Sequence, residues 1–139
     1  MDLSIVIPLY NEGESIIELN SSIYNILCKS DVKFELIYVD DGSTDNSWKN
    51  LIEISKNQSN IYACRFLKNY GKSMALSAGF YKSKGKVVIT MDADLQDDPN
   101  EILPLYKMIN DGGNDIVSGW KKKRYDSIIF KNIPSKLFN

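Results

Sequence analysis

The amino-acid sequence predicts an α/β fold, in which a doubly wound, mostly parallel sheet is flanked by helices. β-Branched and apolar runs alternate with segments of helical spacing along the 139 residues, and parallel strands need crossover helices of this kind. The predicted strands are continuously apolar rather than alternating, which is typical of strands covered on both faces. A chain of this length fits one domain with a substantial core.

Three strands separated by two helices are predicted in the first half of the chain, in the ranges 3–7, 15–28, 34–39, 44–56 and 61–67. The first strand is β-branched and stops at Pro8, and the first helix has apolar residues at helical spacing. The second strand ends at a D-D-G-S turn sequence, after which Ser43 or Thr44 is expected to cap the second helix. The fourth and fifth ranges show the same helical and strand-like patterns.

Two further helices and two strands are predicted in the ranges 71–83, 87–91, 99–110 and 116–118. The sequence K-G-K closes the first of these helices, and Pro99 suits the first turn of the second. A pair of glycines ends that second helix before the short apolar run at 116–118, which offers a fifth strand. Residues 1–119 are therefore predicted to form the core domain, with 120–139 as a separate basic and aromatic segment.

Composition excludes several classes of function. The formal net charge is −1, so the chain has no global attraction to nucleic acid. It contains no histidine, which removes the commonest general base and transition-metal ligand. Cys28 and Cys64 form no disulfide or thiolate-metal pattern, and we expect both in the core. Neither a signal peptide nor an apolar run of about 20 residues is visible, so the chain as supplied is expected to be soluble and cytosolic.

Acidic residues follow three of the predicted strands, at the sheet edge where open α/β sheets bind ligands. The sharpest signal is Asp92-Ala93-Asp94, because residues two apart in extended backbone point to the same face. Two carboxylates so placed repel each other unless a cation lies between them. Mg²⁺ or Mn²⁺ suits such oxygen ligands, and the amide oxygen of Gln96 can add another. The alternative is a solvated acidic turn.

Other strand ends carry groups that suit a nucleotide. Asp40 or Asp41 can accept hydrogen bonds from a base or ribose, although a turn with a helix cap explains the same residues. Lys72 opens a predicted helix, where the ammonium and backbone N–H groups can meet a diphosphate; a solvated lysine is the alternative. No P-loop or dinucleotide glycine motif is present. Further acceptors and a flat apolar wall follow the first strand, at Pro8, Tyr10, Asn11 and Glu12.

Four motifs together resemble family 2 glycosyltransferases of the GT-A fold. They are I-V-I-P-L-Y-N-E at 5–12, V-D-D-G-S-T-D at 39–45, N-Y-G-K at 69–72 and M-D-A-D-L-Q-D-D-P at 91–99. Their order and spacing match that family over nearly the whole chain. The last motif and the later V-S-G-W-K-K-K-R-Y-D and P-S-K-L-F-N resemble the dolichyl-phosphate mannose synthase group, which includes bacterial polyprenyl-phosphate glycosyltransferases.

The resemblance implies a metal-dependent, inverting transfer of a sugar from a UDP- or GDP-linked donor to undecaprenyl or dolichyl phosphate. The implied metal is Mg²⁺ or Mn²⁺, and its predicted ligands are Asp92, Asp94 and Gln96. These three residues, Lys121 and Arg124 are the predicted catalytic residues. Together with the residue-level arguments, the predicted nucleotide-binding set is Pro8, Tyr10, Asn11, Glu12, Asp40, Asp41, Lys72, Asp92 and Ala93.

Family members continue into amphipathic and usually transmembrane helices. This chain is therefore expected to be a fragment of a protein that works at the cytoplasmic face of a membrane. Its basic cluster, Lys121-Lys122-Lys123-Arg124, is interleaved with aromatic and apolar residues and offers a surface for an anionic lipid. A solvated basic face is the alternative reading of the same cluster.

Acceptor chemistry mildly favours a lipid phosphate, because a phosphate is already largely anionic near neutral pH and needs little help from a general base. A glycan hydroxyl acceptor would need a base, for which several carboxylates are available. Two further classes are less well matched. A nucleotidyltransferase is expected to carry a glycine-rich basic loop after the first strand. A receiver-like signalling module is expected to carry its acid pair there and a lysine after the fifth strand.

Overall fold

The structure is a computed structural model that describes residues 1–119, and it confirms the predicted α/β fold. The strands are β1 (Leu3–Leu9), β2 (Phe34–Asp40), β3 (Ile61–Arg65) and β4 (Val87–Thr90). The helices are α1 (Ile16–Leu27), α2 (Ser47–Lys56), α3 (Lys72–Lys82) and α4 (Ile102–Asn110), the last preceded by a 3₁₀ turn, η1 (Pro99–Glu101). No helix in the described part of the chain is long and apolar enough to cross a membrane.

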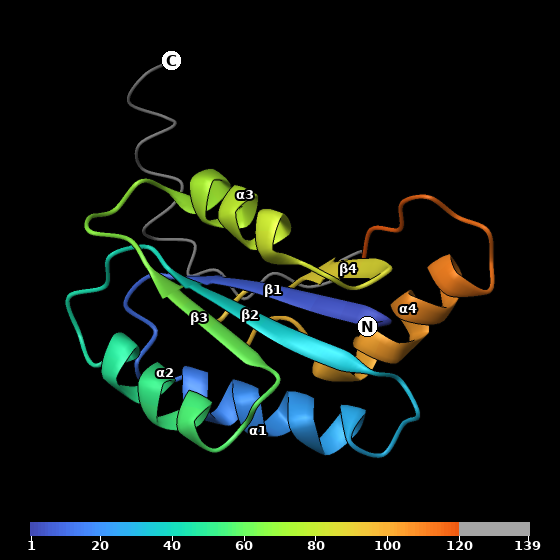
Figure 1. Cartoon of the computed structure of the whole chain (residues 1–139), viewed down its shortest axis with the longest axis horizontal. Coiled ribbons are helices and arrows are strands. Elements are labelled where there is room, and N and C mark those ends of the chain that lie inside the picture. The colour runs from blue at the N-terminus through green and yellow to red at the C-terminus, as the bar shows by residue number, and fades with distance from the viewer. Residues whose placement is uncertain (120–139) are drawn as a thin grey trace, which may run out of the picture.

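The strands form one parallel sheet in the order β3-β2-β1-β4. From β1 the chain moves outward to β2 and β3, with α1 and α2 on one face, and then returns past β1 to β4 through α3 on the opposite face (Figure 1). The strand order therefore reverses between β1 and β4. In doubly wound sheets the carboxyl ends of the strands at such a reversal form the ligand-binding crevice.

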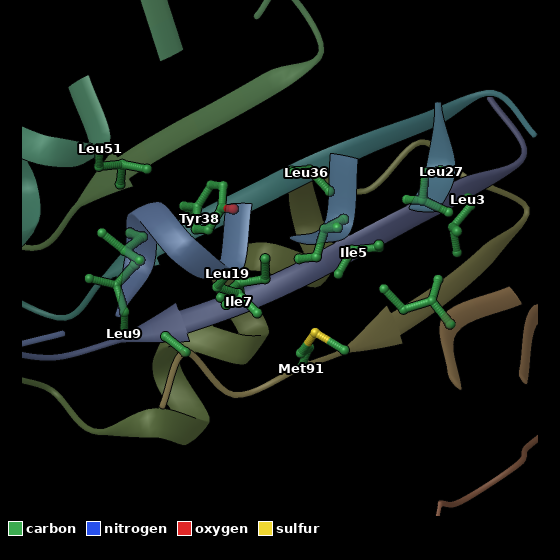
Figure 2. Packing of buried hydrophobic residues seen from close by; sticks show 14 of the residues in the cluster. Leu3, Ile5, Ile7, Leu9, Leu19, Leu27, Leu36, Tyr38, Leu51 and Met91 are labelled. Atoms are coloured by element: carbon green, nitrogen blue, oxygen red, sulfur yellow. The ribbon is translucent and has the colours of Figure 1, made fainter. Parts of the chain in front are cut away.

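Alternate residues of the buried strands face different helices. The α1 side of β1 is made by Leu3, Ile5, Ile7 and Leu9, which pack with residues such as Leu19, Leu36, Tyr38 and Leu51 (Figure 2). Val6, on the other face of β1, packs with Ile37 and Val39 of β2 and with Ala75 of α3. Both faces of the central strands are therefore apolar, as the continuous hydrophobic runs predict. Each leucine, isoleucine and valine side chain among them stabilises the fold by about 1.5–3 kcal/mol when fully buried.

Proline within β1 costs no sheet hydrogen bond. The carbonyl of Val6 accepts from the N–H of Met91, so this side of Val6 faces β4. Pro8 lies two residues on and faces the same way, but the pairing of β1 with β4 ends at Val6 and Thr90. The missing N–H of Pro8 therefore points beyond the ladder, and β1 extends to Leu9 instead of stopping at residue 7.

The predicted cap of α2 is wrong. The helix begins at Ser47 with Asn46 in the cap position, and the Asn46 side chain makes no capping hydrogen bond. The N–H of Ser47 donates to the Asp45 carboxylate at 2.9 Å. The hydroxyl of Ser43 instead accepts from the N–H of Asn11 at 2.9 Å, while the N–H of Thr44 donates to the Asn11 side chain at 2.8 Å. These residues join two loops, a tertiary contact that outweighs their local preference for a cap.

Three other expectations differ from the structure. Residues 116–118 form no strand, and the Ile116 side chain is 88% exposed, because a strand exists only where a neighbour pairs with it. The third strand ends at Arg65 rather than at Leu67, whose side chain is fully exposed. Cys28 is exposed after the last turn of α1, whereas Cys64 is half-buried as expected of a core residue. Burial raises the pKa of the Cys64 thiol.

Close approach of α3 to β1 depends on Gly79. A Cβ atom at this position would lie 2.3 Å from Cγ1 of Val6, well inside contact distance. Because both residues are buried, the helix could not keep its position above a larger side chain.

Gly79→Ala is expected to destabilise the domain by about 1–3 kcal/mol through overpacking, although alanine is intrinsically the better helix former by about 0.8–1.0 kcal/mol. In a Val6→Ala background the same change should be neutral or stabilising, because the colliding methyl groups are gone. Ser77→Ala, on the exposed face of α3, should change the stability by less than about 0.5 kcal/mol. Urea unfolding of the four variants measures this, and equal effects of Gly79→Ala in both backgrounds would contradict the steric explanation.

Candidate active site

A pocket of about 290 Å³ opens at the carboxyl ends of β1, β2 and β4 and at the start of α3. It lies at the reversal of strand order, where ligands bind in doubly wound sheets. Its lining includes the predicted residues Pro8, Tyr10, Glu12, Asp41, Lys72, Asp92, Ala93 and Asp94. Leu9, Asn69, Gly71 and Ala75 also line it. Three predicted residues, Asn11, Asp40 and Gln96, are not part of the lining.

Asp40 and Asp41 have different surroundings although they are adjacent in sequence. In β2, Ile37 and Val39 face α3, and Asp41 continues this phase. Its carboxylate is almost fully buried and accepts from the N–H groups of Tyr70 and Gly71 at 2.7 and 2.8 Å. Asp41 thus lines the pocket and also fixes the segment that leads into α3.

Asp40 lies beneath the following loop rather than at the pocket. Its side chain is fully buried, and Oδ1 accepts from the N–H of Ser43 at 2.8 Å. Within residues 1–119, Oδ2 accepts no hydrogen bond, and its nearest cation is Arg65, with Nε at 3.4 Å. Arg65 also donates to the Ser43 carbonyl and lies over the Trp48 ring. Asp40 therefore stabilises the turn that presents Asp41.

The loop after β1 is tied to the loop after β2 by a series of hydrogen bonds. Besides the two Asn11 contacts already described, the N–H of Glu12 donates to the Ser47 hydroxyl at 2.8 Å and that of Gly13 to Asp45 at 3.0 Å. Burial of the Asp45 carboxyl acts to raise its pKa, but hydrogen bonds from Ser47 and Gly13 outweigh it and lower the pKa. Asn11 has a left-handed backbone, with φ 57°. Its hydrogen bonds to Ser43 and Thr44 hold the loop that carries Tyr10 and Glu12.

Two glycines bring the loop before α3 against the loop after β2. Gly42 has φ +76°, and a Cβ there would lie 2.6 Å from the Lys68 carbonyl carbon. Gly71 has φ +95° and open space around it, so only its backbone conformation calls for glycine. Lys72 is the one residue of this segment predicted to bind the nucleotide, but Asn69 and Gly71 also line the pocket. The N-Y-G-K motif was the available signal, whereas the proximity to Asp41 depends on the fold.

Asp92 and Asp94 follow β4 and both line the pocket. The N–H of Asp92 donates to the Asp97 side chain at 2.9 Å, and Asp94 accepts from the N–H of Gln96 at 3.1 Å. The Gln96 side chain is exposed. Leu95, between Asp94 and Gln96, has φ 62°. This conformation is unusual for a bulky residue, costs of order 1–3 kcal/mol and is concentrated at functional turns.

A cation already lies beside this acid pair. Nζ of Lys72 is 2.5 Å from Oδ1 of Asp92. The predicted metal ligand Asp92 therefore already pairs with a positive charge in this structure. The described residues contain no group of three or more histidine, cysteine or acidic side chains placed to hold a metal ion. Mg²⁺ and Mn²⁺ fit a site with two carboxylates, because such ions take their remaining ligands from water and substrate phosphates.

The remaining predicted catalytic residues, Lys121 and Arg124, belong to the segment 120–139, which lies outside the described residues. Eight of the predicted residues therefore line one pocket, and their role in nucleotide binding stays a prediction. The acceptor side stays a prediction from the sequence.

Comparison with known proteins places the chain in a family. The family model described as Glycosyl transferase family 2 matches residues 4–137. Over 138 residues the chain is 41% identical to the undecaprenyl-phosphate 4-deoxy-4-formamido-L-arabinose transferase of Proteus mirabilis (strain HI4320), a match that covers 99% of this chain and 42% of that protein. The chain thus spans less than half the length of this curated relative.

Solved glycosyltransferases share the fold. S. aureus TarS 1–349 in complex with UDP-GlcNAc superimposes with a TM-score of 0.66 at 25% identity, over 94% of this chain and 38% of the TarS 1–349 chain. The mannosyltransferase PcManGT from Pyrobaculum calidifontis, in complex with GDP-Man and Mn²⁺, has a TM-score of 0.66 at 23% identity, over 78% of this chain and 32% of that protein. By its family model, its relatives and its fold, the chain belongs to glycosyl transferase family 2.

Proposed function

We propose that this chain is the sugar-donor-binding part of a metal-dependent, inverting glycosyltransferase that moves a sugar from a nucleoside diphosphate to a polyprenyl phosphate. The observation that carries the proposal is the meeting of Asp41, Lys72, Asp92 and Asp94 around one pocket at the strand-order reversal. The membership in family 2 and the sequence identity to an undecaprenyl-phosphate sugar transferase support the same activity.

The proposed nucleoside site lies on the β1 and β2 side of the pocket. Pro8 and the half-exposed ring of Tyr10 provide an apolar wall against which a base can pack. Asp41 and Glu12 provide carboxylate acceptors for base N–H or ribose hydroxyl groups. The UDP-GlcNAc complex of TarS supports a nucleotide sugar as the ligand of this fold.

The proposed diphosphate site lies between α3 and the acid pair. Lys72 is the first residue of α3, where the free N–H groups and the helix dipole favour negative charge. Asp92 and Asp94 would hold Mg²⁺ or Mn²⁺, and Gln96 stays a third candidate ligand. When bound, the divalent ion supplies neutralisation of the charge that builds on the leaving diphosphate.

Polyprenyl phosphate fits a site without histidine, because the acceptor oxygen is already anionic and needs little deprotonation. We assign its phosphate to Lys121 and Arg124, on the strength of the basic and aromatic segment 120–139. Attack by that oxygen on the face of the sugar carbon opposite the diphosphate would invert the anomeric configuration. Because the acceptor is a membrane lipid, we place the whole protein at the cytoplasmic face of a membrane.

A nucleoside diphosphate and Mn²⁺ together should stabilise the chain more than the sum of their separate effects. At 100 times the dissociation constant, ligand binding adds about 2.7 kcal/mol to the free energy of unfolding, which corresponds to a rise of roughly 5–10 °C in a domain of this size. Thermal unfolding with GDP or UDP, each with and without Mn²⁺, measures this. Equal melting temperatures with and without metal at saturating nucleotide would contradict metal-dependent binding.

Asp94→Asn should abolish the metal-dependent part of nucleotide binding and leave the ligand-free stability equal or higher. Asparagine keeps an oxygen for the N–H of Gln96, while the loss of charge relieves repulsion with Asp92. Asp98→Asn is the matched control, because Asp98 also accepts from a backbone N–H, that of Asn100, but does not line the pocket. Calorimetric titration with nucleotide and Mn²⁺ compares the two. An unchanged affinity in Asp94→Asn would exclude Asp94 as a ligand.

Lys121→Ala and Arg124→Ala are expected to raise the KM for polyprenyl phosphate about tenfold or more, since each removes a charge-assisted hydrogen bond worth about 1.5–3 kcal/mol. The dissociation constant of the nucleotide should not change, because the donor residues lie elsewhere. Sugar transfer to undecaprenyl phosphate by the longer protein that contains this chain provides the measurement. A change in nucleotide affinity without a change in acceptor KM would refute the assignment.

A further inference from the structure

The ion pair between Lys72 and Asp92 joins two groups to which the proposed function gives different ligands. Nζ of Lys72 lies 2.5 Å from Oδ1 of Asp92, and their side chains are 58% and 35% exposed. Lys72 is assigned to the diphosphate and Asp92 to the divalent ion. In the ligand-free chain, however, each serves as the partner of the other.

A divalent ion and this ammonium cannot both stay close to Asp92 without strong mutual repulsion, because two cations would share one carboxylate. Binding of the metal by itself must therefore displace Lys72 from its only ion-pair partner among the described residues. A diphosphate changes this balance, since it offers Lys72 a new anionic partner and offers the metal further oxygen ligands.

Only the side chain of Lys72 needs to move in this exchange. The backbone just before it is fixed, because the N–H groups of Tyr70 and Gly71 both donate to the buried carboxylate of Asp41. The lysine stem is long, flexible and exposed, so the ammonium can swing within the pocket while the start of α3 stays in place.

We propose that Lys72 is a built-in counterion that occupies Asp92 before the sugar donor arrives and transfers to the donor diphosphate when the divalent ion takes Asp92. This inference rests on the proposed function and adds an energetic coupling to it. The metal alone binds weakly, the nucleotide alone binds weakly, and each strengthens the other by the same factor. Lys72 is thus a positioning residue that couples occupancy of the two subsites.

The test is calorimetric titration of the chain with Mn²⁺ alone, with GDP or UDP alone, and with Mn²⁺ at saturating nucleotide. Lys72→Met removes the charge and keeps the length of the side chain. Lys82→Met is the matched control, since Lys82 is in the last turn of the same helix, about 15 Å away at 1.5 Å per residue. At that separation, salt of 0.1 M or more screens its charge from the metal site.

In Lys72→Met, Mn²⁺ alone should bind about three- to tenfold more tightly than in the unaltered chain, because it no longer competes with an ammonium. The nucleotide should bind about tenfold more weakly in the presence of Mn²⁺, because the diphosphate has lost a cation. The factor by which nucleotide strengthens Mn²⁺ binding should therefore fall by tenfold or more, where each tenfold equals about 1.4 kcal/mol. Lys82→Met should bind both ligands as the unaltered chain does, and the ligand-free melting temperature of Lys72→Met should equal that of the unaltered chain.

Two outcomes overturn the inference in distinguishable ways. If the unaltered chain binds Mn²⁺ and nucleotide cooperatively and Lys72→Met has the same affinity for Mn²⁺ alone and the same cooperativity, the counterion role is wrong and the proposed function stands. If the unaltered chain shows no metal-dependent nucleotide binding, the proposed function fails and takes the inference with it. A purely structural role for Lys72 would instead lower the melting temperature without raising the affinity for Mn²⁺.

Discussion

The buried carboxylate of Asp41 is the contact on which the site depends. It accepts two backbone hydrogen bonds from the segment that leads into α3. These bonds join the end of β2 to the start of α3. A carboxylate with so little exposure is tolerated only where charge-assisted hydrogen bonds replace its hydration. The positive N-terminus of α3 adds a further favourable interaction. This contact fixes the backbone just before α3, and the packing of α3 on β1 then holds Lys72 within reach of Asp92.

Strand order explains why these groups meet. The return of the chain through α3 to β4 places the acid pair beside the end of β1, although β1 and β4 are separated by most of the chain. Gly79 permits this return, since it lets α3 pack directly on Val6. Hydrogen bonds between the loops after β1 and β2 then hold the apolar wall at Pro8 and Tyr10 opposite the acids.

Charge balance gives the pocket its chemistry. Acidic side chains on three strand ends surround one ammonium and one helix N-terminus. Such a site is poorly matched to a simple anion, which the carboxylates would repel, and poorly matched to a lone cation, which Lys72 would oppose. It suits a ligand that brings both signs of charge together, as a diphosphate with its divalent ion does. The proposed donor is of this kind, and family 2 membership is in agreement with it.

The sequence by itself determined the α/β class, most of the strands and helices, and the strand ends that carry Asp41, Asp92 and Asp94. These follow from local periodicity and from the rule that parallel strands end at one edge. Only the tertiary structure decided that Asp41 and not Asp40 reaches the pocket, that Ser43 joins two loops instead of capping α2, and that Lys72 pairs with Asp92. Residues 116–118 likewise form no strand despite their apolar pattern. The reason is common to all four: each depends on which partner the fold brings near, and a partner distant in sequence leaves no trace in local periodicity.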